Sequence, residues 1–170
     1  MKSNELLLDA FGRIRETVEA ALEGLDEASL VRRPSGTGNS IAWLIWHLSR
    51  VEDAQVAEAA DVDQVWTAQN FVARFDLPLR AGDTGYGHSS EQVDAVKASR
   101  ELLLEYYDAV HRQTADFLQT LDDGDLDRVV DTRWDPPVTL GVRLVSTIAD
   151  CLQHVGQAAY AKGLKLTQVQ

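Results

Sequence analysis

Apolar side chains recur every three or four positions in four stretches of the chain, separated by segments rich in glycine, proline and acidic residues. This spacing places them on one face of an α-helix, so each stretch predicts an amphipathic helix. Polar residues whose side chains can accept hydrogen bonds from free backbone N–H groups stand at the expected starts. The predicted helices are residues 4–25, a second that begins after Asn39 or Ser40 and continues through Val51, a third from Ser89 or Ser90 to Leu121, and a fourth that opens at Thr139 and ends before Gly163.

The helical period fails over residues 62–90, the longest connection between predicted helices. Trp66, Phe71 and Phe75 are apolar there without a helical repeat, and the text LPLRAGDTGYGHSS is typical of a loop. Loops of this length are uncommon in compact domains and are often lids or binding loops. No pair of strands is predicted. The pattern therefore predicts a single all-α domain over residues 1–170, a four-helix bundle with a long crossover connection between its second and third helices.

Acidic residues outnumber basic ones, which narrows the classes of partner. The 170 residues include 16 Lys and Arg against 27 Asp and Glu, a formal net charge of −11 with histidine neutral. A phosphate backbone or an anionic membrane surface requires a basic footprint, so we expect neither nucleic acid nor a membrane as partner. No stretch has the roughly 18 apolar residues of a spanning helix, and acidic residues interrupt the apolar N-terminus. We therefore expect a cytoplasmic protein.

The chain has one cysteine, Cys151. A single thiol can form neither an internal disulfide nor a cysteine cage for zinc. Its place in an apolar helical run is typical of a small core residue. A domain of this size buries enough surface to fold without a metal, so a metal site here would serve function rather than folding.

Three ionisable side chains could meet at one metal ion. Asp150 and His154 are four residues apart on one face of the fourth predicted helix, and His47 lies inside the apolar text of the second. If these helices face each other, two imidazoles and one carboxylate converge and leave coordination positions open, as in catalytic sites. The same spacing also occurs in solvated ion pairs. Spacing alone leaves both interpretations open.

The text NSIAWLIWHLSRVED in the second helix, with DCLQHVGQAAYAKG in the fourth, resembles the DinB-like superfamily. Within it, the chain is similar to the branch related to the metal-binding domain of mycothiol-dependent maleylpyruvate isomerase. The likeness covers nearly the whole chain and implies a DinB-like bundle in which His47, Asp150 and His154 bind a divalent metal. Zinc is the expected ion, with nickel or another ion as the alternative. Asp150 departs from the glutamate of that branch, and the isomerase has a further C-terminal domain that helps form its substrate pocket.

The resemblance also implies chemistry on a thiol. A cation held by two neutral imidazoles and one carboxylate favours the anionic form of a bound water or thiol, and the thiolate is the nucleophilic form. We expect a thiol-dependent S-transferase or isomerase of the mycothiol type, acting on a small electrophile. A metal-dependent hydrolase, a bundle that binds a small ligand or metal without turnover, and a metal-free interaction module stay open as alternatives. Related bundles often pair, so a homodimer is the expected assembly.

The glycine-rich loop and the tryptophans of the second helix supply candidate substrate contacts. Tyr86 and His88 precede the third predicted helix, whose free N–H groups favour anions, and could cover the mouth of the bundle. The alternative is a solvated loop in which His88 only caps the helix, and tryptophans are also common core fillers. His111, beside Asp108 and Arg112, is expected on the surface. The candidate substrate-binding residues are Trp43, Trp46, Arg74, Arg80, Tyr86 and His88, and Gln157 is the candidate for a hydrogen bond to a metal ligand.

Overall fold

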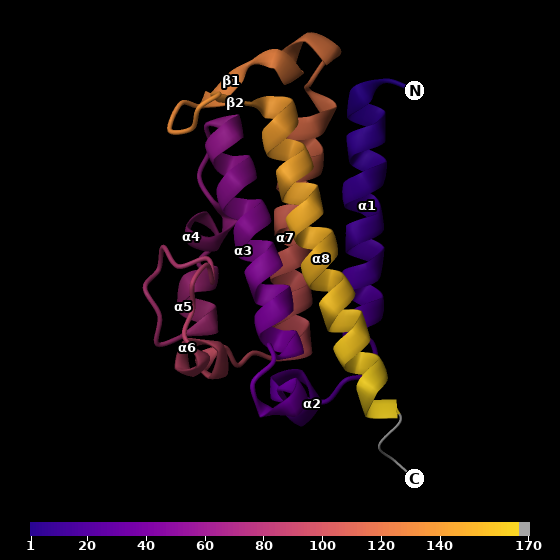
Figure 1. Cartoon of the computed structure of the whole chain (residues 1–170), viewed down its shortest axis with the longest axis vertical. Coiled ribbons are helices and arrows are strands. Elements are labelled where there is room, and N and C mark those ends of the chain that lie inside the picture. The colour runs from indigo at the N-terminus through magenta and orange to yellow at the C-terminus, as the bar shows by residue number, and fades with distance from the viewer. Residues whose placement is uncertain (167–170) are drawn as a thin grey trace.

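The computed structural model describes residues 1–166, with side chains through Leu164. Four long helices run side by side (Figure 1). They are α1 (Ser3–Leu22), α3 (Ile41–Ala60), α7 (Arg100–Gln119) and α8 (Leu140–Leu166). α1 and α8 run in one direction and α3 and α7 in the other, so α3 is antiparallel to α8. The predicted all-α, DinB-like bundle is confirmed.

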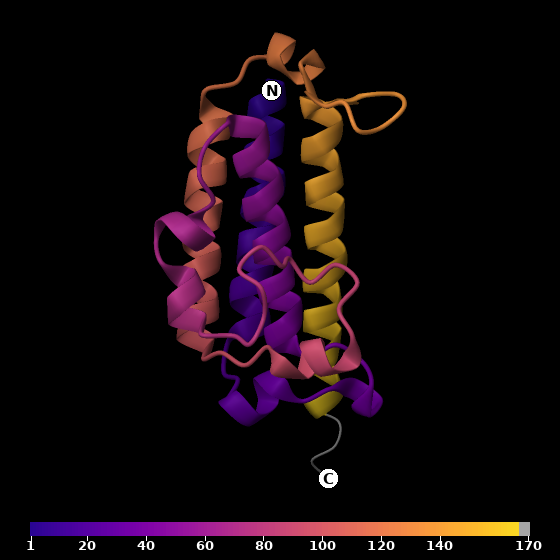
Figure 2. The same ribbon diagram turned by 90° about the vertical axis from the view of Figure 1, so that its left-hand side faces the viewer.

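Short elements connect the long helices. α2 and a 3-10 turn, η1, join α1 to α3, and the crossover that carries α4, α5 and α6 returns from the far end of α3 to the start of α7. The long crossover between these two helices was predicted from the sequence, and it lies across one side of α3 (Figure 2). The bounds of the short elements are α2 (Glu27–Val31), η1 (Pro34–Gly36), α4 (Val65–Ala68), α5 (Phe71–Phe75), α6 (Ser90–Ala95), η2 (Asp123–Asp127), β1 (Val129–Asp131) and β2 (Val138–Thr139).

The third predicted helix is divided in two. Val96 follows α6 in an extended conformation, with φ −79° and ψ 98°, and its side chain is buried. The Ser99 side chain then accepts a hydrogen bond from the Leu102 N–H at 3.1 Å and begins α7. The prediction of one continuous helix is therefore wrong. The backbone is extended at the buried Val96, and Ser99 is the N-cap of a new helix.

Two further helix boundaries and one pair of strands differ from the prediction. α1 ends at Leu22 because Gly24 adopts φ +71°, the left-handed conformation that commonly ends helices. α8 continues past Gly163, since one glycine costs a helix only about 1 kcal/mol. β1 and β2 form a small antiparallel pair that was not predicted, because strands of two and three residues are too short to show an alternating pattern.

α3 is the central helix of the arrangement. Every residue from Ile41 to Asp53 is buried. α7 and α8 pack against one side of the helix, and the crossover covers the other (Figure 2). Ser40 begins the helix by accepting a hydrogen bond from the Trp43 N–H at 3.1 Å, as its position predicted. Because α3 is enclosed on both sides, its polar side chains must find partners inside the protein.

Two polar contacts fix the register of α3 against α8. The Thr147 hydroxyl donates to Gln55 Oε1 at 2.7 Å, and the Cys151 thiol, buried as predicted, lies 3.7 Å from the Leu48 carbonyl oxygen. Because the two helices are antiparallel, each turn further along α8 faces a turn nearer the start of α3. The turn of α8 that follows Cys151 therefore faces the second turn of α3.

Asp53 on α3 fixes the start of the crossover. Its carboxylate accepts hydrogen bonds from the backbone N–H groups of Val65 and Trp66, each at 2.8 Å, and from the Tyr106 hydroxyl at 2.8 Å. Arg50 Nη1 lies 3.4 Å from the same carboxylate. These bonds satisfy free N–H groups at the start of α4 and hold the crossover against the bundle.

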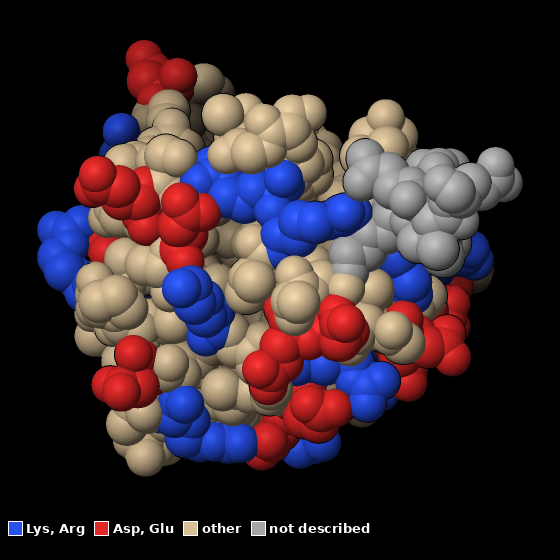
Figure 3. Space-filling view, turned by 90° about the horizontal axis from the view of Figure 1, so that it is seen from below, with Lys and Arg blue, Asp and Glu red and all other residues tan. Residues whose placement is uncertain are grey.

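Charged side chains of both signs are interspersed on the surface. At the lower end of the bundle, Lys and Arg side chains stand among Asp and Glu (Figure 3). The outer side of α8 instead exposes the apolar residues Val142, Val145, Leu152 and Tyr160. None of the described helices is long and apolar enough to cross a bilayer.

Glu52, on α3, is a fully buried acid. Its carboxyl group accepts a hydrogen bond from the Thr114 hydroxyl at 2.8 Å. Burial raises its pKa from 4.5 to about 7, because the charged form loses its solvation, and the Thr114 bond opposes this shift in part. The folded protein therefore holds a proton on Glu52 that the unfolded chain releases at lower pH.

We predict that Glu52→Gln removes a pH-dependent loss of stability. A folded-state pKa above the unfolded value contributes stability that is present below pH 4.5 and lost as the pH rises through about 7. From pH 4.5 to pH 9, the unfolding free energy of the variant should therefore gain about 3 kcal/mol on that of the wild type. Urea unfolding across this range measures the difference, and a pH-independent difference would contradict the prediction.

Candidate metal centre

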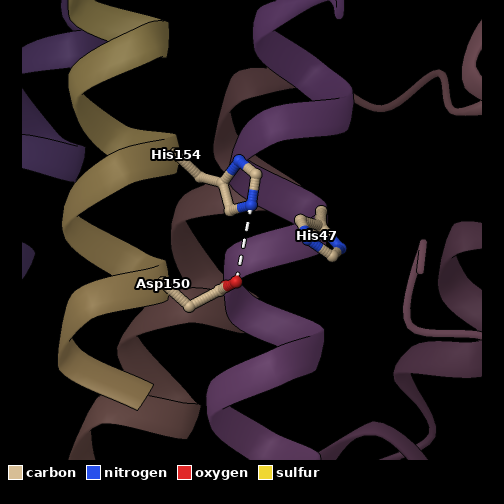
Figure 4. Close-up of side chains that lie close together, drawn as sticks. All are labelled: His47, Asp150 and His154. Carbon is tan, nitrogen blue, oxygen red and sulfur yellow. Dashed lines mark ion pairs between the residues drawn. The ribbon is translucent and has the colours of Figure 1, made fainter. Parts of the chain in front are cut away.

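His47, Asp150 and His154 converge between α3 and α8 (Figure 4). One potential ligand atom from each lies within 4.8 Å of the others. Asp150 and His154, one turn apart on α8, point towards α3, and His154 Nε2 lies 3.6 Å from Asp150 Oδ1. The His47 and His154 ring centroids are 4.5 Å apart, with nearly perpendicular planes. The structure thus brings together the three side chains singled out from the sequence.

Burial and one hydrogen bond set the state of the His47 ring. Its Nδ1 contacts the carbonyl oxygen of Thr84. Because a carbonyl oxygen only accepts, Nδ1 carries the proton and Nε2 keeps its lone pair. Burial lowers the pKa of His47, and the Thr84 bond opposes this shift in part. A neutral imidazole with a free ring nitrogen is the form that binds a metal.

The three donors fit a divalent cation. Two ligand atoms that each lie about 2.1 Å from one ion are at most about 4.2 Å apart, so the observed spacing is close to that of a bound set. Asp150 Oδ2 and His154 Nδ1 are shielded from solvent and have no hydrogen-bond partner among the described residues. A shielded carboxylate oxygen without a partner is costly, and a cation between the three side chains would satisfy it.

A loop of the crossover covers His47, and we refer to residues 81–88 as the covering loop. A Cβ at Gly85 would lie 2.5 Å from His47 Nδ1 and 3.1 Å from Trp43 Cζ2, and the backbone there has φ +99°. Only glycine allows so close an approach in this conformation. Thr84 and Gly85 could not be singled out from the sequence, because glycine-rich text indicates a loop but not which of its residues touches the site.

The predicted aromatic contacts gather beneath the covering loop. Trp43 stacks on His47, with ring centroids 4.6 Å apart and planes at 15°, and its indole N–H donates to His88 Nδ1 at 3.2 Å. The His88 ring stacks on Trp46 at 5.7 Å. His88 is therefore buried against α3, and the alternative that it caps a helix is wrong, because the Ser89 side chain caps α6.

The other predicted loop contacts lie apart from this cluster. Arg74 binds the two carboxylate oxygens of Glu105 at 2.8 and 2.5 Å, and Arg80 pairs with Asp83 at 2.8 Å. Tyr86, within the covering loop, is 94% exposed. The loop crosses the side of α3 (Figure 2) rather than an open end of the bundle. Both guanidinium groups are thus engaged by acidic side chains in this structure.

Gln157 and His111 were also singled out from the sequence. Gln157 is exposed, and its hydrogen bond to a metal ligand stays a prediction. His111 is half-buried rather than on the surface. Its ring stacks on that of Tyr107, one turn earlier on α7, with centroids 6.2 Å apart.

The fold and the donor set define a helical bundle with a candidate site of two histidines and one carboxylate. The family model of mycothiol-S-transferase matches residues 6–164, and the chain belongs to this family. The fold is also that of the crystal structure of the conserved protein of locus from Enterococcus faecalis, with a TM-score of 0.91, 32% sequence identity and 99% of each chain covered. The search of curated proteins finds no match to this sequence.

The family match refines the resemblance noted in the sequence. That resemblance implied an S-transferase or isomerase of the mycothiol type, and the matching family is named for S-transfer. The mycothiol connection is confirmed at the level of the family. The family match does not identify the metal, the electrophile or the ligand roles of the three side chains.

We predict that Gly85→Ala destabilises the protein more than Gly87→Ala. Both glycines have positive φ, but a Cβ at Gly87 meets nothing within 4 Å, whereas one at Gly85 collides with His47. The collision should lower the unfolding free energy of Gly85→Ala by about 1–3 kcal/mol more than that of the control. Urea unfolding of the two variants measures this difference, and equal losses would mean that the close contact is not present.

Proposed function

We propose that this chain binds a divalent cation at His47, Asp150 and His154 and transfers a small-molecule thiol to an electrophile. The observation that carries the proposal is the convergence of two imidazoles and a carboxylate whose Oδ2 has no hydrogen-bond partner within the part of the chain that the structure describes. Membership of the mycothiol-S-transferase family supports mycothiol as the thiol.

Each side chain has a defined part in this proposal. A divalent cation bound there would favour the thiolate form of a coordinated thiol at neutral pH. Burial favours the neutral form of His47, and the Thr84 carbonyl places its proton on Nδ1. Asp150 supplies one negative charge, so the occupied site would keep a net charge near +1. This charge favours an anionic nucleophile. Two imidazoles and a carboxylate suit zinc, and nickel or iron is also compatible with such donors.

The reaction uses a thiol from outside the chain. Cys151 is fully buried, and burial raises the pKa of its thiol well above the ordinary value, so this residue is unsuited as the nucleophile. In the transfer, the sulfur of the small thiol forms a bond to the electrophilic carbon while the bond to the leaving group breaks. The thiol proton passes to solvent, and the leaving group departs with the bonding electrons.

A metal-dependent hydrolase is a weaker candidate for the same site. Hydrolysis of an ester or amide calls for a general base beside the attacking water. The acid of the covering loop, Asp83, is already engaged by Arg80 Nε and by the Arg80 backbone N–H.

A bundle that binds a metal or a small ligand without turnover differs from both enzymes only in activity. The expected homodimer and the cytoplasmic location stay predictions.

We predict that purified wild type contains about one divalent ion per chain and conjugates mycothiol to an alkyl or aryl halide. His47→Ala should lower both metal content and rate, the rate by about 100-fold or more, because it deletes a ligand rather than a neighbour of one. Parallel assays with bacillithiol and glutathione identify the preferred thiol.

His111→Gln is the matched control, because this histidine stacks on Tyr107 outside the group of three. It should retain metal content and rate. A wild-type metal content well below one per chain, or equal rates in wild type and His47→Ala, would contradict the proposed function.

A further inference from the structure

The face of α3 beneath the covering loop is formed by residues at intervals of three and four. Trp43, Trp46, His47 and Arg50 are all buried there, and this spacing places them on one side of a helix. Elsewhere α3 packs against long helices, but here a loop of irregular backbone takes their place (Figure 2). Such a loop keeps its position only where its polar groups are bound.

Side chains from α3 and α4 bind backbone carbonyls in the first half of the covering loop. The Trp66 indole N–H donates to the Ala81 carbonyl at 2.9 Å, and Arg50 Nε donates to the Asp83 carbonyl at 3.2 Å. His47 Nδ1 binds the next carbonyl, that of Thr84. These three contacts secure the first half of the loop and leave its second half to another anchor.

His88 is that anchor. Its side chain is only 4% exposed, lies on the Trp46 ring, and accepts the indole N–H of Trp43 through Nδ1. Its backbone N–H donates to the Gly85 carbonyl at 3.2 Å, which ties the anchor to the residue that touches His47. His88 Nε2 has no hydrogen-bond partner among the described residues.

The same contacts connect His88 to the orientation of His47. Trp43, which donates to His88, also stacks on the His47 ring. His88 thus secures both the indole that supports one face of the ring and the turn that brings the Thr84 carbonyl to Nδ1. That carbonyl is what keeps the lone pair on Nε2. A ring freed from these contacts can change tautomer or rotamer.

We propose that His88 is a positioning residue for the metal centre: it anchors the covering loop so that the Thr84 carbonyl holds His47 with Nε2 free for the cation. This inference rests on the proposed function only in taking His47 as a ligand. Partners that orient a metal-bound histidine typically contribute about 10- to 100-fold to metal affinity. His88 acts through Trp43 and Thr84 and touches neither the cation nor the substrate.

Three variants test the proposal. His88→Ala removes the acceptor for the Trp43 indole, whereas His88→Asn keeps an oxygen near the place of Nδ1. Tyr86→Ala is the control, because Tyr86 belongs to the same loop but is 94% exposed. Zinc affinity is measured by competition with a chelator, and the tautomer of His47 is read from its imidazole ¹⁵N shifts in metal-free protein.

We expect His88→Ala to weaken zinc binding by about 10-fold or more and to lose the single Nδ1–H tautomer of His47. His88→Asn should recover most of both, and Tyr86→Ala should match the wild type. Unchanged zinc affinity and an unchanged tautomer in His88→Ala would overturn the proposal. The proposed function fails separately if the wild type binds zinc and His88→Ala weakens that binding, but the wild type transfers no thiol.

Discussion

The packing of α3 against α8 in a single antiparallel register is the constraint on which the site depends. Asp150 and His154 are adjacent because they occupy one helix, but His47 reaches them only through this register. A slip of one helical turn would displace it by about 5.4 Å, more than the spacing of the whole group. The contacts Thr147–Gln55 and Cys151–Leu48 keep the register in place from inside the interface.

The covering loop supplies the second half of the site. The long helices bring the ligands together, while the loop determines the chemical state of one of them through the Thr84 carbonyl and the close approach of Gly85. Burial of His47 beneath this loop lowers its pKa and so favours the neutral ring that a metal requires. The crossover between α3 and α7 is therefore part of the functional architecture as well as a connection.

Local periodicity predicted the four long helices apart from the division of the third, and Ser40 is one of the two N-cap residues that the sequence indicated for α3. The group of His47, Asp150 and His154 was also accessible, since two members share a helical face and the resemblance indicated the third. The division at Val96, the role of Thr84 and the burial of His88 were not accessible. Each depends on packing between segments far apart in the sequence, which a local sequence pattern cannot predict.

The most direct test of the account is anomalous X-ray diffraction from crystals of the metal-loaded protein, recorded at the absorption edge of the bound metal. We predict one strong peak within about 2.0–2.2 Å of His47 Nε2, a ring nitrogen of His154 and a carboxylate oxygen of Asp150. A peak held by other side chains, or no peak between α3 and α8, would contradict the account.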